Sequence, residues 1–309
     1  MTKFLHLSDV AFASYPVVPL RWFFAVARLQ GVVRQKTNKR LSLTVRNNLA
    51  SLKPGLSDTE LDTRTRRFFE YARLRELLFL LVPKMADQTL SQLCPVEGLD
   101  QLDRCRASGR GAILLASHLN SRANFLMVVM LKRRGYDIRV ALPVEEDPWA
   151  PSAFRSLINR RSGIRSYFEC IGAFYSQFNI RPIARALTEG AIIVQTGDGW
   201  HSAGFAEVDF LNRRLPFTTG MMRVAQLTGV PIVPIFASGT PPDLLKFVIE
   251  EPFHVERSEP VEAKVATYAK RLEYYVLEHP ECWEHLEIPD LLQSWSNWSK
   301  RPLHERYLV

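Results

Sequence analysis

The feature that most constrains the fold of this chain is an alternation of short apolar runs and amphipathic stretches that begins at Gly111. Residues 112–116 (AILLA) and 191–196 (AIIVQT) are typical of buried strands. Residues 124–134 follow the helical period and end in a run of cations before Gly135. This alternation predicts βαβ units, and therefore an α/β fold with a largely parallel or mixed sheet flanked by helices.

The pattern continues to the end of the chain. We expect further strands at residues 138–142, 166–170, 207–210, 232–236 and 246–249, and further helices opening at Pro151 and covering residues 181–189, 219–227 and 261–277. Upstream, Ser57 and Glu60 form a capping box, and the residues after it contain neither Gly nor Pro until Pro83, which predicts a long helix. No break in composition divides the chain, so we predict a single domain over residues 1–309, with an N-terminal helical section (1–90) that contacts the membrane and an α/β core (91–309).

Polar side chains follow two of the expected strands. Residues 117–124 (SHLNSRAN) come directly after the first strand, and residues 196–201 (TGDGWH) complete the other. Ligands of open α/β sheets bind outside the carboxyl ends of the strands. A histidine there, such as His118, can act as a general base beside a helix N-terminus that stabilises negative charge. The alternatives are a hydrogen-bonded structural histidine and, for Asp198 between two glycines, ordinary turn chemistry.

The order of several sequence blocks resembles the lysophospholipid acyltransferase superfamily, and within it the bacterial lipid A late-acyltransferase type. The blocks run through most of the chain: VRNNL (45–49) with PGLS (54–57), AILLASH (112–118), IARALTEG (183–190) leading into AIIVQTGDG (191–199), VDFLNRR (208–214), TG (219–220) and VPIVPI (230–235).

The resemblance implies transfer of an acyl group from an acyl carrier protein or coenzyme A thioester to a hydroxyl of a lipid or glycolipid. It implies that His118 deprotonates the acceptor. Asp198 with Gly199 matches an acidic block that binds the acceptor or orients a base. Arg181 matches a basic position suited to an acceptor phosphate.

Five further residues are candidates for substrate binding. Asn120, Arg122 and Asn124 lie close to His118 in the sequence. Arg213 and Arg214 fall in a block that matches the family, with a solvated hairpin tip as their alternative interpretation. The acyl donor is a co-substrate, so the resemblance implies no separate cofactor.

One position departs from the family motif, His-x4-Asp/Glu, whose carboxylate holds the imidazole one helical turn away. The fifth residue after His118 is Ala123, which cannot accept a hydrogen bond through its side chain. Asn124 could hold an imidazole N–H but supplies no charge. Three explanations are open: another acid, Asp198 or Glu169, takes the role; the reaction needs a weaker base, as with an amine acceptor; or the protein has kept ligand binding and lost catalysis.

Charge and aromatic residues indicate the partners. Forty Lys and Arg against thirty-two Asp and Glu leave a net charge of +8, which suits an anionic lipid or membrane surface. The basic residues are scattered without a recognition motif, so we do not expect nucleic-acid binding. Residues 10–29 are too interrupted to span a membrane but have the composition of an interfacial helix. Trp295 and Trp298, followed by Lys300 and Arg301, repeat that composition near the end.

Together with what the resemblance implies, these observations predict a peripheral protein at the cytoplasmic face of the inner membrane, or a cytoplasmic one. The chain has four widely spaced cysteines, which we interpret as reduced, buried thiols, and it has no metal-binding motif. Candidates for an acyl groove are Phe125, Met127, Met221 and Met222.

Two alternative functions follow from the missing carboxylate. The first is a non-standard transferase, which moves an aminoacyl group or a carrier-bound intermediate of secondary metabolism. The second is a non-catalytic module that binds a lipid or a carrier protein. The oligomeric state, the acyl length and the acceptor are not predictable from these patterns.

Overall fold

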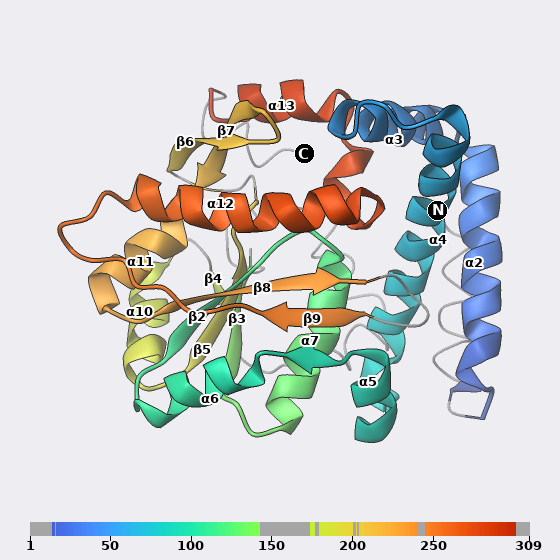
Figure 1. Ribbon diagram of the computed structural model, residues 1–309. Helices are drawn as coiled ribbons and strands as arrows, with labels where there is room; N and C mark the ends of the chain where they lie inside the picture. Colours follow the sequence, from blue (N-terminus) through green and yellow to red (C-terminus); the bar gives the residue numbers. More distant parts are fainter. Residues whose placement is uncertain are drawn as a thin grey trace.

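The computed structural model describes residues 14–15, 17–142, 174–176, 179–199, 202, 204–239 and 245–300. Within these residues it has the expected α/β architecture (Figure 1). The expected helix at Pro151 and strand at residues 166–170 lie outside the described residues, as does Cys170.

A mixed sheet forms the centre of the molecule. Its strands are β1 (Val96–Glu97), β2 (Ala112–Ala116), β3 (Ile138–Leu142), β4 (Phe174–Ser176), β5 (Ile192–Thr196), β8 (Ile232–Ser238) and β9 (Lys246–Ile249). In space they follow the order β1-β9-β8-β2-β5-β3-β4. Every neighbouring pair is parallel except β8 and β9, which are antiparallel.

Helices cover both faces of this sheet because the strand side chains alternate between them. Ile113 and Leu115 point into a core shared with α10 (Ile180–Thr188), α11 (Gly220–Thr228) and α12 (Val261–Glu278), which we call the α12-side core. Leu114 points into the opposite core, built with α6 (Leu99–Ala107) and α7 (Ser121–Arg133), which we call the α7-side core. A short helix, α5 (Asp87–Leu93), joins the α7-side core.

The N-terminal section consists of α2 (Leu20–Thr37), α3 (Lys39–Leu52) and α4 (Asp58–Leu81). The predicted capping box at Ser57 and Glu60 is present and starts α4. Phe68 of α4 joins the α12-side core and Leu78 joins the α7-side core, so this helix connects the two. Helix α2 packs along α4 on the edge of the molecule (Figure 1).

A hairpin and a C-terminal segment complete the described structure. Strands β6 (Phe205–Phe210) and β7 (Arg213–Thr218) pair antiparallel around a turn in which Leu211 and Asn212 have positive φ angles. The sequence predicted only the first of these strands. Two 3-10 turns, η2 (Pro280–Cys282) and η3 (Glu284–Glu287), and helix α13 (Leu291–Trp298) follow α12.

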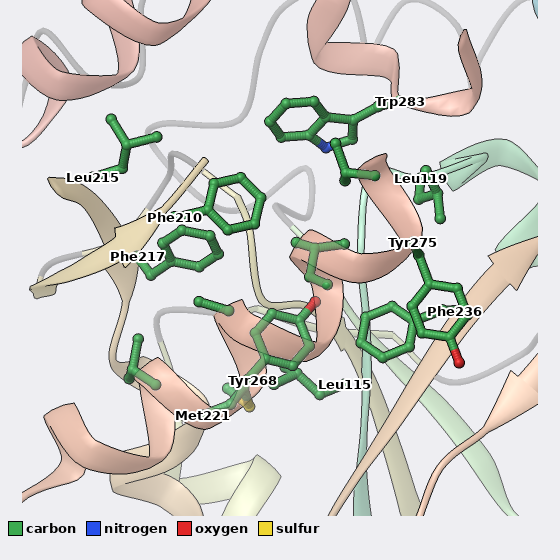
Figure 2. Packing of buried hydrophobic residues seen from close by; sticks show 14 of the residues in the cluster. Leu115, Leu119, Phe210, Leu215, Phe217, Met221, Phe236, Tyr268, Tyr275 and Trp283 are labelled. Carbon is green, nitrogen blue, oxygen red and sulfur yellow. The ribbon is translucent and has the colours of Figure 1, made fainter. Parts of the chain in front are cut away.

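Two interpretations of apolar residues were wrong. Trp295 and Trp298 are only 1% and 2% exposed, so they belong to the α12-side core rather than to a membrane-facing surface. The candidate groove residues do not line one groove, because Met221 and Met222 are buried in the α12-side core while Met127 is buried in the α7-side core. Figure 2 shows Met221 among the packed side chains of the α12-side core.

The described cysteines Cys94, Cys105 and Cys282 are free and buried, as predicted. Their thiols are held protonated by burial, which raises the pKa of Cys94 and of Cys282 to about 12. No described helix combines the length and the apolar composition that crossing a membrane requires.

Candidate active site

Strands β2 and β5 bring the two predicted polar clusters together. The strands pair in parallel, with Ala116 beside Thr196 at their carboxyl ends. The chain continues from these two residues into the loops that carry His118 and Asp198. The backbone N–H of Gly197 donates to the carbonyl of Ala116 at 2.8 Å and ties the loops to each other.

Asp198 holds the imidazole of His118. Its Oδ1 lies 2.9 Å from Nδ1 of His118, and both carboxylate oxygens accept from the backbone N–H of His118, at 2.9 and 3.0 Å. The Asp198 side chain is fully buried, whereas that of His118 is 29% exposed. Because an ionised carboxylate can only accept, Nδ1 carries the proton and Nε2 carries the lone pair. This is the tautomer that a general base requires.

A segment far away in the sequence closes the site from the other side. Leu119 and Trp283 form an antiparallel bridge, and the backbone N–H of Glu284 donates to the carbonyl of His118 at 3.1 Å. The indole Nε1 of Trp283 donates to Oδ2 of Asp198 at 3.2 Å. The ring of His285 lies 4.5 Å from that of His118, measured between centroids.

The sequence analysis missed Trp283, Glu284 and His285. They fall beyond the last matching block and outside any expected strand or helix. The one available signal was the composition of the segment, a tryptophan and a histidine between Pro280 and Pro289, which is unusual for a solvated connection.

A second buried network supports the loop that carries His118. The side chain of Arg75, 1% exposed, donates from Nη1 to Oδ1 of Asn120 at 2.7 Å and approaches Oε1 of Glu284 to 3.3 Å through its Nε. Glu284 also accepts from Oγ of Ser121 at 2.6 Å. Its Oε1 also accepts from the backbone N–H of Arg122 at 3.4 Å, so Glu284 caps the N-terminus of α7, where the N-cap residue Asn120 makes no side-chain capping bond of its own.

The charges of these groups depend on one another. Burial alone would raise the pKa of Asp198, but the charge and the hydrogen bond of His118 outweigh it and lower that pKa to about 2. Burial alone would lower the pKa of His118, and the carboxylates of Asp198 and Glu284 reverse this, so that its pKa is raised. Burial, followed by the charge of His118, lowers the pKa of His285 to about 4. At neutral pH Asp198 is ionised and His285 is neutral.

His118, Asp198 and His285 also form the kind of cluster that could hold a metal ion, since their ligand atoms lie within 4.8 Å of one another. The geometry does not fit such a centre. The two imidazole rings lie face to face, with centroids 4.5 Å apart and a tilt of 31°. Nδ1 of His118 and Nε2 of His285 are already hydrogen-bonded to Asp198. We therefore treat the cluster as a hydrogen-bonded acid–base site.

The position of Ala123 shows why it is not the partner of His118. Ala123 is fully buried in the α7-side core. Asn124, which could have replaced the carboxylate, instead donates to the carbonyl of Ser117 at 2.9 Å. Of the two acids considered, Asp198 contacts the imidazole, and Glu169 lies outside the described residues.

Asn120 and Asn124 are both buried and hydrogen-bonded to main-chain carbonyl groups. Asn120 has no exposed surface and donates to the carbonyl of Ala237 at 3.1 Å besides accepting from Arg75. Its left-handed φ of 50° suits asparagine and turns the chain into α7. Both asparagines therefore shape the His118 loop, and their part in substrate binding stays a prediction.

The other candidates for substrate binding are spread over several elements. Gly199 lies beside the imidazole, since a Cβ built on it would be 3.8 Å from Cε1 of His118. Arg122 is exposed in the first turn of α7. Arg181 is exposed in the first turn of α10, and none of the contacts found in the described residues joins it to His118 or Asp198.

Arg213 and Arg214 open β7 on the exposed hairpin. The guanidinium of Arg214 donates to the carbonyl of Glu207 at 2.8 Å. Their part in substrate binding stays a prediction.

The fold and this site together define a class of protein: an α/β protein with a hydrogen-bonded histidine–carboxylate pair at the carboxyl edge of its sheet. Comparison with known families names the class. The model of the bacterial lipid A biosynthesis acyltransferase family matches residues 7–287, and the chain belongs to this family. Membership implies acyl transfer to a lipid acceptor. The search of curated proteins found no match.

Proposed function

We propose that the protein transfers an acyl group from an acyl carrier protein or coenzyme A thioester to a hydroxyl or amine of a lipid acceptor, with His118 as the general base. Asp198 takes the place of the carboxylate missing at position 123. The observation that carries this proposal is the 2.9 Å contact between Nδ1 of His118 and the fully buried Oδ1 of Asp198. Asp198 comes from the loop after β5, whereas position 123 lies in helix α7.

The chemistry proceeds in two steps. Nε2 of His118 takes the proton of the acceptor as its oxygen or nitrogen attacks the thioester carbonyl, and a tetrahedral intermediate forms. This intermediate collapses as the C–S bond breaks, and the thiolate leaves with the proton from the imidazolium. Asp198 stays ionised throughout, because a carboxyl group with a pKa of about 2 does not accept the proton. Its charge stabilises the imidazolium and its hydrogen bond fixes the tautomer.

The sharpest test compares variants of the two residues with a matched histidine control. Wild type, His118→Ala, Asp198→Asn and the exposed control His254→Ala are incubated with acyl carrier protein or coenzyme A thioesters and a total lipid extract. Mass spectrometry follows thioester loss and new acylated lipid. We expect both site variants to lose about 10²–10⁴-fold in rate and the control to lose nothing.

Other outcomes identify the alternatives. Transfer of an aminoacyl or secondary-metabolite group instead of a fatty acyl group would establish the non-standard transferase. No turnover by the wild type, with thioester or lipid still bound, would indicate the non-catalytic module. Equal rates in wild type and His118→Ala would remove His118 from the mechanism.

We also propose that the protein attaches peripherally to an anionic membrane through the outer face of α2. Trp22, Val26, Leu29 and Val33 are 60%, 46%, 64% and 42% exposed. Their spacing places them in one line along the helix, which we call the α2 stripe. The opposite face is buried on α4, so the exposed line is not the core-facing one.

The positive charge of α2 and α3 indicates that the α2 stripe contacts an anionic lipid surface. The sequences of α2 and α3 contain no Asp or Glu. Arg21, Arg28, Lys36, Lys39 and Arg40 of these helices are exposed. Apolar and aromatic side chains among cations bind the headgroup boundary, each cation near an anionic membrane contributing about 1 kcal/mol. Attachment at this face would place the acceptor lipid on the side of the molecule where the N-terminal helices lie.

Vesicle binding tests the attachment separately from catalysis. We expect wild type to co-sediment with vesicles containing anionic phospholipid and much less with zwitterionic ones. The variant Trp22→Ser/Leu29→Ser should bind at least about tenfold more weakly because it exposes far less apolar surface to the membrane. The variant Leu227→Ser/Tyr274→Ser is the control, since those side chains are 63% and 62% exposed on other helices. Equal loss in both variants would rule out a specific role for α2.

A further inference from the structure

A second histidine lies inside the candidate site, and the acyl-transfer steps do not use it. His285 is the second residue of η3 and is only 8% exposed. Its Nε2 is 3.0 Å from the main-chain carbonyl oxygen of Asp198 and 3.7 Å from Oδ2 of the same residue. A carbonyl oxygen can only accept, so Nε2 carries a proton that it donates to Asp198.

The surroundings of His285 hold its ring in place. The ring faces that of His118 at a centroid distance of 4.5 Å and a tilt of 31°. The rings of Trp283 and Trp295 meet it at steep angles of 66° and 75°, with centroids 5.3 and 5.4 Å away. A ring packed between three others cannot turn without displacing buried aromatic side chains.

The loop that carries Asp198 needs support from outside. Asp198 stands between Gly197 and Gly199, the residue type with the greatest backbone freedom. A carboxylate at position 123 would be held by helix α7, but Asp198 lies in the loop after β5 and is held by its contacts. Trp283 binds its Oδ2, His118 binds its Oδ1, and His285 binds its main-chain carbonyl.

We propose that His285 is a positioning residue that holds the Asp198 loop against His118, through the hydrogen bond from its Nε2 to the Asp198 carbonyl. Its action on the reaction is indirect, since it keeps the carboxylate within hydrogen-bonding distance of the base. This inference rests on the proposed role of His118. The groups that face His118 are Asp198, Glu284 and His285, and Glu284 is in turn faced by Arg75 and Arg122.

Two substitutions separate the hydrogen bond from the ring. His285→Gln places an amide N–H near the position of Nε2 and removes the ring. His285→Phe keeps the ring and removes the donor. His254→Phe, at an exposed histidine, is the matched control. The measured quantities are the pKa of His118, from NMR titration of isotope-labelled histidine, and kcat, KM and the pH profile of acyl transfer.

We expect His285→Phe to lower the pKa of His118 by about 0.5 units or more, because the carboxylate that favours the imidazolium moves away. The acid limb of its kcat/KM profile should move to lower pH by the same amount. Its kcat should fall at least about tenfold with an unchanged KM, and His285→Gln should stay within about threefold of wild type. An unchanged His118 pKa in His285→Phe, or a larger loss in His285→Gln than in His285→Phe, would overturn the proposal.

Two features keep this test decisive. The wild-type protein should show His285 as the Nε2–H tautomer with a slowly exchanging proton, and an Nδ1–H tautomer would overturn the proposal even if both variants failed to fold. The His118 titration needs no substrate. A protein that transfers no acyl group could therefore still show the shift, which separates failure of this inference from failure of the proposed function.

Discussion

The two ends of the described chain carry the same kind of sequence, tryptophan close to basic residues, and fold into opposite environments. Trp22 of α2 is 60% exposed, whereas Trp295 and Trp298 of α13 are 1% and 2% exposed. Composition cannot distinguish the two regions, because an amphipathic aromatic ring suits both a membrane boundary and a core whose polar atom has a partner.

The difference lies in what each helix packs against. In α13 the indole Nε1 of Trp295 donates to the carbonyl of Pro216 at 2.7 Å, and its ring contacts Phe217 and Trp283 at centroid distances of 5.1 and 5.4 Å. In α2 the buried positions are Ala27 and Gly31, small residues that let the helix approach α4 closely. Phe23 and Phe24 pack partly buried against the cores, and the residues of the α2 stripe are left on the outside. A tryptophan is buried where the surrounding fold supplies a hydrogen-bond acceptor and ring partners for it.

The largest effect should come from truncating one tryptophan of each region. Trp295→Ala should lower the free energy of unfolding by about 3–5 kcal/mol, because it opens a cavity and leaves the Pro216 carbonyl without its donor. Trp22→Ala should stay within about 0.5 kcal/mol of wild type. Urea unfolding followed by intrinsic fluorescence and circular dichroism measures both values. Equal destabilisation by the two substitutions would mean that α2 does not expose its stripe.

The second-largest effect should come from low pH. Trp283 of the C-terminal segment contacts Asp198, whereas α2 contains no carboxylate, so acid should destabilise the C-terminal region and not α2. The pKa of Asp198 is about 2 in the folded protein against an ordinary value of 3.8. Stability from this group is therefore present above pH 4 and is lost as the pH falls toward 2, by about 2 kcal/mol. The lowered pKa of Glu284 acts in the same direction.

Urea unfolding of wild type and Asp198→Asn at several pH values below 5 tests this prediction. The difference in stability between the two proteins should shrink by about 2 kcal/mol over that range, since the asparagine has no proton to gain. A constant difference would show that Asp198 is not stabilised as a carboxylate.

The smallest loss of stability should come from a substitution at Gly31, on the side of α2 that packs against α4. A Cβ added at Gly31 would lie 2.7 Å from Cα of Glu70 and from the carbonyl oxygen of Phe69, both backbone atoms that cannot move aside locally. Overpacking costs about 1–3 kcal/mol, while alanine gains about 1 kcal/mol over glycine inside a helix, so Gly31→Ala should destabilise by about 1 kcal/mol net.

Thermal melting of Gly31→Ala, compared with Ala25→Leu on the exposed side of α2, measures this difference. Ala25→Leu should leave the melting temperature nearly unchanged, since it adds apolar surface where nothing is packed. Stabilisation by Gly31→Ala would show that α2 does not dock closely on α4 and would weaken the assignment of its outer face.

Much of the fold could be predicted because it depends on short-range patterns. The run AILLA is buried over its whole length in β2, and the capping box at Ser57 starts α4 as expected. The hairpin partner β7 was missed, since it begins with two arginines and contains a proline, both untypical of strands. The turn that makes the hairpin uses Leu211 with a φ of 54°, a residue type that gives no turn signal.

The site was predictable in part. His118 and Asp198 were both recognisable as polar residues at strand ends. Their contact depends on β2 and β5 being neighbours in the sheet, although α7, β3, β4 and α10 lie between them along the chain. Trp283, Glu284 and His285 had no pattern to mark them. They reach the site through contacts between residues far apart in the sequence: Trp283 and His285 contact Asp198 across 85 and 87 residues, and Glu284 contacts Ser121 across 163.

The sequence by itself determined the α/β class, the strand that leads to His118, the absence of a carboxylate at position 123, and the family that the order of its blocks resembles. These properties follow from periodicity and from residue identity at a fixed spacing. Only the tertiary structure decided which acid faces the base, which tryptophans are buried, and that a second histidine supports the Asp198 loop. Each of these depends on the distance between atoms far apart along the chain, which is set by strand order and packing.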